Sequence, residues 1–176
     1  PSATDIRRTF ATNTSAQCYV DCTTTGRGRC HVYSLPFAFD HMCGLTNQFP
    51  GGQFTRVRKL LVADLTCAFE HEFFERISRS FPRLTHLTVF NDREPTRPTQ
   101  RPDNKPVSVP VEYARLIELD VHATHIAYVA QFLDHTRTRM PRLTVLNVDY
   151  EQLVAVTNGF TNDIARLNCA TVERVI

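Results

Sequence analysis

The chain has 176 residues, of which 42% are hydrophobic and 22% are charged, and its formal net charge is +2. A chain of this length buries roughly 70% of its unfolded surface on folding, so it can build a core of its own. The composition excludes a largely disordered or collagen-like chain, and no apolar run is long enough to span a membrane. The mild charge argues against nucleic-acid binding, which needs a concentrated basic surface.

Residues 1–30 differ from the rest of the chain, and we expect an N-terminal flank or an atypical capping repeat there. The chain begins with Pro1 instead of Met, which suggests a piece of a longer protein. The six cysteines are Cys18, Cys22, Cys30, Cys43, Cys67 and Cys169. The first three could bind a metal together with His31, or the thiols could form disulfides. Short paired knuckles such as Cys-x2-Cys are absent, so we expect reduced thiols and no cofactor.

One apolar pattern recurs over residues 31–176: an apolar residue, two of any kind, a second apolar residue, one of any kind and a third. Its copies are Val32-Leu35-Phe37, Val57-Leu60-Val62, Leu84-Leu87-Val89, Leu116-Leu119-Val121 and Leu143-Leu146-Val148, with a clipped copy at Val172 and Val175. The alternation at the end of each copy predicts a short strand. A strand–helix unit of this size cannot bury its apolar face alone, so we expect the units to stack around one core.

Helices are expected in the stretches between these strands. Their apolar residues are Met42, Leu45 and Phe49 after a cap at Asp40; Phe69, Phe73, Ile77 and Phe81; Ile126, Val129, Ala130 and Leu133; and Leu153, Val156 and Phe160. Spacings of three or four residues place the members of each set on one helix face. Asp149 followed by Gln152 is typical of a helix start, and Asn158-Gly159 of a helix end.

The longest connection holds a Pro/Arg-rich loop at residues 91–110. Its first 16 residues contain no apolar side chain except proline, so burial cannot offset the entropy of ordering them. We expect a mobile, extended loop that replaces one helix. Pro95-x-x-Pro98 beside Arg93 and Arg97 has the outline of an SH3 ligand, although a solvated loop is the favoured interpretation.

Two copies agree in more than their pattern, since Phe81–Val89 and Met140–Val148 share Pro, Arg, Leu, Thr, Leu and Val in the same places. The repeat resembles a leucine-rich repeat, and with Asp149-Tyr150-Glu151 it looks most like the tail of F-box/leucine-rich-repeat proteins. The resemblance implies an α/β leucine-rich-repeat solenoid with a curved parallel sheet and outer helices. It also implies an intracellular protein, cytoplasmic or nuclear, that recognises substrates for a ubiquitin ligase, with the F-box upstream of this chain.

The repeats are degenerate. The family usually places Asn or Cys at the ninth position of the motif, where the side chain bonds the backbone of the turn. Here that position holds Asp40, Leu65, Asp92, Thr124 and Glu151. A doubly wound α/β domain would show a similar alternation of strands and helices and is the alternative fold.

The chain carries no phosphate-loop, dinucleotide-binding or nucleophile-elbow motif, so we predict that it is not an enzyme. Cys67 and His71 could be a nucleophile and its base, but Cys67 falls at an inward position of the repeat, where we expect a buried, inert thiol. The alternative function is a small metal-dependent hydrolase whose site would contain His122, His125, Asp120 and Asp149.

The best candidate for a functional surface is the outward face of the strands, at the third, fifth and seventh positions of each copy. Neighbouring parallel strands lie about 4.8 Å apart, so residues at one position form a column. Ser34, Pro36 and Ala38 would begin the columns, Leu61 and Phe90 would be apolar anchors, and an acidic patch would contain Glu118, Asp120 and Asp149. We predict that a protein partner, which the sequence does not identify, contacts Lys59, Leu61, His86, Thr88, Phe90, Glu118, Asp120, His122, Asn147 and Asp149.

Overall fold

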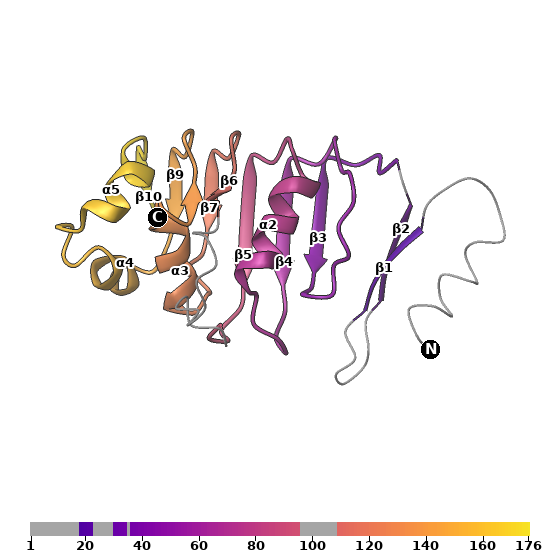
Figure 1. The fold of residues 1–176 in the computed structure, drawn as a ribbon, viewed down its shortest axis with the longest axis horizontal. Helices are drawn as coiled ribbons and strands as arrows, with labels where there is room; N and C mark the ends of the chain where they lie inside the picture. The colour runs from indigo at the N-terminus through magenta and orange to yellow at the C-terminus, as the bar shows by residue number, and fades with distance from the viewer. Residues whose placement is uncertain (1–17, 23–29, 35, 96–108) are drawn as a thin grey trace.

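The computed structural model describes residues 18–22, 30–34, 36–95 and 109–176, which form an α/β structure on a six-stranded parallel sheet. In chain order, the strands of this sheet are β3 (His41–Leu45), β4 (Lys59–Ala63), β5 (His86–Phe90), β7 (Glu118–Asp120), β9 (Val145–Asn147) and β10 (Arg174–Val175). The helices in the same ranges are α2 (His71–Ser80), α3 (Ile126–Leu133), α4 (Tyr150–Val156) and α5 (Asp163–Cys169). Figure 1 shows the strands side by side along the long axis of the molecule. Of these helices, none is long and apolar enough to cross a membrane.

Two smaller pairs of strands accompany this sheet. The strands β1 (Cys18–Cys22) and β2 (Cys30–Ser34) pair antiparallel, and β6 (Val111–Glu112) pairs in parallel with β8 (Thr138–Arg139). The described residues between β5 and β7 contain β6. Residues 96–108, which include much of the SH3-like segment, lie outside the described residues.

The six strands lie in the sheet in the same order as in the chain, and all neighbouring strands are parallel. A doubly wound domain reverses its strand order at one point of the sheet, and this sheet has no such reversal over the part of the chain that is described. The predicted copies that begin at positions 57, 84, 116, 143 and 172 each supply one strand. The prediction of an α/β structure with a parallel sheet is therefore confirmed.

Five strands enter this sheet through the same kind of hydrogen bond, namely β4, β5, β7, β9 and β10. One backbone carbonyl of the preceding unit accepts the N–H groups of two successive residues, at N···O distances of 2.6 to 3.1 Å. These carbonyls belong to Asp40, Arg58, Thr85, Ile117 and Thr144. At two of the entries a threonine hydroxyl donates to the same oxygen, from Thr85 to Arg58 at 3.0 Å and from Thr144 to Ile117 at 3.4 Å. The shared carbonyl therefore sets the register of each strand on the one before it.

The first strand of the sheet is not where the repeat pattern predicts it. The copy predicted at Val32–Phe37 begins inside β2, which pairs only with β1. Instead, β3 fills this place, with Met42 and Leu45 buried, so the helix predicted after Asp40 is wrong. A bulge between Cys43 and Leu45, with Gly44 at a φ of 74°, adds one residue and hides the pattern.

The residues before β3 still contribute to the core, through an aromatic cluster at the N-terminal end of the sheet. The ring of Tyr33 lies 5.4 Å from that of Phe54, which stacks on Phe81 at 4.8 Å. Phe49 stacks on the other side of this group, 5.7 Å from Phe81, and is fully buried. Burial of each such ring contributes roughly 1.5–3 kcal/mol, so this cluster closes one end of the core.

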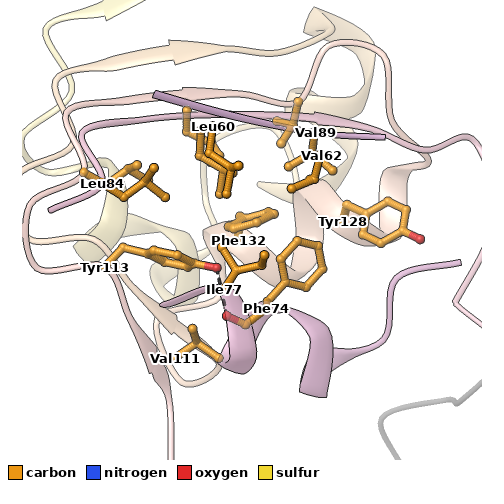
Figure 2. Close-up of a cluster of buried hydrophobic side chains, with 14 of the residues drawn as sticks. Leu60, Val62, Phe74, Ile77, Leu84, Val89, Val111, Tyr113, Tyr128 and Phe132 are labelled. Atoms are coloured by element: carbon orange, nitrogen blue, oxygen red, sulfur yellow. Dashed lines mark hydrogen bonds between the residues drawn. The ribbon is translucent and has the colours of Figure 1, made fainter. Parts of the chain in front are cut away.

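The main core lies on one face of the sheet. Its strand residues alternate with half-buried or exposed neighbours and are Leu60, Val62, Leu87, Val89, Leu119 and Leu146. Figure 2 shows Phe74 and Ile77 of α2, together with Phe132 of α3, on the side of the sheet to which Leu60, Val62 and Val89 point. The hydroxyl of Tyr113 donates to the carbonyl of Phe74 at 3.1 Å, and burial raises the pKa of this hydroxyl. The opposite face of the sheet carries no described helix, and we call it the open face.

The helices follow the predicted positions with local differences. All four residues of the stripe Phe69, Phe73, Ile77 and Phe81 are buried, so this prediction is confirmed. In α3 the buried side chains are centred on Tyr128 and Phe132, and Ile126 at the helix start is 37% exposed.

The helix predicted at residues 153–160 is shorter than the apolar pattern suggests. Asp149 caps α4, as predicted, by accepting the N–H groups of Glu151 and Gln152. The predicted stop is also confirmed, since Asn158 and Gly159 have positive φ angles of 50° and 65°. Phe160 therefore lies beyond the helix and is 62% exposed.

The helix α5 has no counterpart among the helices expected from the apolar pattern. This helix is held through the buried side chain of Asn168, whose amide donates to the carbonyls of Phe132 at 2.9 Å and Thr138 at 2.7 Å. Its carbonyl oxygen accepts the N–H of Met140 at 3.3 Å. The side chain of Asn168 thus joins α5 to the preceding unit, alongside Ala165, which is part of the hydrophobic core.

Buried polar side chains hold the turns that follow the strands. Asp64 accepts the N–H groups of Asn47, Thr66 and Cys67 at 2.9 to 3.0 Å. In the next turn, the side chain of Asn91 donates to the carbonyl of Cys67 at 2.8 Å. Both residues are at most 3% exposed and lie one position earlier than the family motif suggests. The family motif does not reveal this role, because its ninth position falls on Leu65, which is 72% exposed.

The carboxylate of Asp64 is stabilised in its ionised form. Burial alone would raise its pKa, but hydrogen bonds from the Thr66 hydroxyl and from three backbone N–H groups outweigh burial and lower it. Because the pKa in the folded state lies below that of the unfolded chain, ionised Asp64 stabilises the fold above the unfolded pKa of about 4. This contribution is lost as the pH falls through the folded pKa.

We predict that Asp64→Asn destabilises the protein by about 1–3 kcal/mol at pH 7, because an amide cannot accept all of these N–H groups. The difference from wild type should shrink as the pH falls from about 4, where Asp64 of the unfolded chain becomes protonated, through the lower pKa of Asp64 in the folded state. Urea unfolding followed by circular dichroism across this pH range measures it. Asp92→Asn, at an exposed carboxylate after the next strand, is the control. A constant difference between pH 3 and 7 would contradict the assignment.

Candidate functional site

The open face presents three columns of side chains that cross the strands. The strand register places the third-position residues directly beside one another in the order Lys59, His86, Glu118, Val145 and Arg174. The fifth-position column contains Leu61, Thr88, Asp120 and Asn147. In the seventh-position column, Ala63 pairs with Phe90, and the ring of His122 lies 5.9 Å from that of Phe90. Nine of the ten predicted partner-binding residues are thus brought together, and no bound partner is needed to align them.

The tenth residue, Asp149, lies outside these columns and caps a helix. It follows β9 and accepts the N–H groups of Glu151 and Gln152 at the start of α4. The prediction of Ser34, Pro36 and Ala38 as the first residues of the three columns is also wrong. His41 and Cys43 of β3 pair with Lys59 and Leu61, whereas Ser34, Pro36 and Ala38 lie before the sheet. The signal that could have revealed β3 was Gly44, a residue suited to a bulge inside an otherwise alternating segment.

Histidine–carboxylate contacts organise the charges on the open face. His86 lies 3.6 Å from Glu118 through its Nε2 atom, and its Nδ1 atom is 2.8 Å from the hydroxyl of Thr85. His122 contacts the carboxylate of Asp120 through Nδ1 at 2.6 Å. At the edge of the sheet, a hydrogen bond from His41 lowers the pKa of the exposed Asp40 carboxyl. These contacts orient the imidazoles, while much of each side chain remains accessible to a partner.

The residues of the alternative metal site do not form one. His125 caps α3, with Nδ1 accepting the N–H of Ala127 at 3.2 Å, and His122 is bound to Asp120. Within the described ranges, no three His, Cys, Asp or Glu side chains are placed to hold a metal ion. The N-terminal candidate is not decided by this, because the side chains of Cys18, Cys22, Cys30 and His31 lie outside the described part of the chain.

The prediction that Cys67 is buried is wrong. Its backbone is held in the turn by Asp64 and Asn91, and its thiol is exposed. It lines an open groove of about 870 Å³ together with Thr66, Glu72 and Arg76. His71 contacts Gln131 and Glu75 instead, at 3.4 and 3.7 Å, so the structure does not support a nucleophile–base pair.

We predict that iodoacetamide modifies Cys67 and Cys43 before Cys169. The first two thiols are exposed, whereas burial raises the pKa of Cys169 and so lowers the fraction of reactive thiolate. Mass spectrometry of digests taken over time measures the order, and denatured protein, in which the three thiols should react alike, is the control. Protection of Cys67 in the folded protein would contradict its placement.

Comparison with known proteins identifies no relative. No protein-family model, no curated protein and no solved structure matches this chain. The function is therefore inferred from the residues of the chain and their geometry.

Proposed function

We propose that this chain is a protein–protein interaction module of the leucine-rich-repeat type and that its open face binds the partner. The observation that carries the proposal is that no described helix covers this face, where three contiguous columns combine charged, polar and apolar side chains. The chain-ordered parallel strands and their repeated entry hydrogen bonds support the repeat assignment. Repeat arrays bind partners through such extended surfaces.

The apolar part of the open face supplies candidate anchors. Leu61 and Phe90 lie on adjacent strands and are both half-buried, so they can lose further surface when a partner covers them. Interface binding energy is concentrated in a few such residues, with the surrounding polar groups excluding water. The neighbouring Thr88 and Ala63 leave room for a partner side chain to reach these anchors.

We further propose that the module is intracellular and serves as the substrate-recognition part of an F-box-type ubiquitin ligase receptor. Support comes from the resemblance of Phe81–Val89 and Met140–Val148 to repeats of that family. Affinity purification of the whole protein that contains this chain, followed by mass spectrometry, tests the proposal. We expect the adaptor subunit of the ligase among the recovered proteins. Its absence would end the ubiquitin assignment and leave the interaction module in place.

We predict that the double substitution Leu61→Ala and Phe90→Ala lowers the recovery of the partner at least about tenfold, because two anchors are lost. Crosslinking in cell extract and quantitative mass spectrometry measure the recovery. Leu65→Ala with Leu167→Ala is the matched control, since these side chains are 72% and 65% exposed but lie off the open face. Equal loss in both variants, or no loss in the first, would contradict binding through this face.

A further inference from the structure

The third-position column of the open face carries an alternating charge. Its side chains are Lys59 on β4, Glu118 on β7 and Arg174 on β10, with His86 and Val145 between them. The sign therefore runs positive, negative, positive, and each charged residue is two strands from the next. Asp120 stands beside Glu118 on the same face of β7 and strengthens the negative centre.

The distances between these charges select the conformation of a complementary chain. Two steps between parallel strands correspond to about 9.6 Å. A polyproline II helix has three residues per turn and a rise of about 3.1 Å, so every third side chain returns to the same face after about 9.3 Å. An extended β-strand repeats on one face at about 6.7 or 13 Å, and seven residues of an α-helix span about 10.5 Å. Of these three conformations, polyproline II has the repeat that lies closest to the spacing of the column over both intervals.

We propose that the open face binds a polyproline II segment of a partner protein with the pattern acidic, two residues, basic, two residues, acidic. The inference rests on the proposed function of this face as a binding surface and names its ligand class. The central basic residue is an arginine, whose planar guanidinium can bond Glu118 through Oε1 and Asp120 through Oδ2, while His86 and His122 contact the other oxygen of each carboxylate. The flanking carboxylates lie opposite Lys59 and Arg174, and the intervening residues of the partner cover His86 and Val145.

The probe is a fluorescein-labelled peptide with the sequence Asp-Pro-Pro-Arg-Pro-Pro-Asp, in which proline imposes the required conformation. Two control peptides are compared with it. One is the charge-reversed peptide Arg-Pro-Pro-Asp-Pro-Pro-Arg, and the other is an alanine-rich helical peptide with the original charges placed seven residues apart. Fluorescence anisotropy at low salt measures binding to the chain. We expect the first peptide to bind about tenfold more tightly than either of the others. The expected difference is modest because each exposed ion pair contributes little to the binding free energy.

Charge reversal on the protein tests the assignment of the rungs. In the triple variant Lys59→Glu, Glu118→Lys and Arg174→Glu, the preference for the first peptide should fall at least about tenfold. The control variant Arg79→Glu, Asp163→Lys and Arg166→Glu changes the net charge equally at helix positions that are 78%, 90% and 82% exposed, and should keep the preference. Circular dichroism checks that both variants fold.

Equal binding of the first two peptides by the wild-type chain, a preference for the helical peptide, or equal effects of the two variants would overturn the inference. These failures differ from failure of the proposed function. If substitution of Leu61 and Phe90 abolishes capture of a partner while the chain binds the peptides equally, the open face is a binding surface. The charged column then does not determine which ligand it binds. If neither result is obtained, both proposals fall.

Discussion

The sheet depends on the backbone hydrogen bonds that join the start of each strand to the preceding unit. Two N–H groups of each incoming strand share one carbonyl of the preceding unit, from Asp40 at β4 to Thr144 at β10. Since strand side chains alternate between faces, a slip of one residue would move every apolar side chain of that strand off the core. The shared carbonyl prevents this slip, and it thereby keeps Leu87 in the core and His86 on the open face.

The buried side chains that hold the turns follow from the same packing of neighbouring strands. A backbone N–H group that this packing shields from water needs an acceptor within the protein. Asp64 and Asn91 provide partners at otherwise apolar positions, and each reaches the turn of the preceding unit. Leaving such a group unsatisfied costs about 1–3 kcal/mol, so neighbouring units are coupled by polar bonds as well as by apolar packing.

Much of the sheet was predictable because its signals are local and periodic. The copies at Val57, Leu84, Leu116 and Leu143 keep the alternation that places one side of a strand in a core, so their outward columns could also be derived. The strand β3 escaped because the bulge at Gly44 depends on its pairing with β4, which the sequence does not display. A spacing rule also could not predict the direction of a side chain in a turn, as Cys67 shows by facing solvent. A repeat pattern also cannot show that a residue has a second structural role. Asp149 falls in a column of the predicted open face, but in the structure it caps α4.

The entry hydrogen bonds also bear on how the chain tolerates insertions. The predicted copies from Val57 to Val172 begin 27 to 32 residues apart, yet the strands that they supply enter with the same offset. Length differences are therefore absorbed in the connections, where each doubling of a flexible loop adds only about 0.6 kcal/mol of closure entropy. The segment between β5 and β7 can lengthen or shorten with little effect on the columns of the open face. Recognition and loop length can accordingly vary independently in chains of this design.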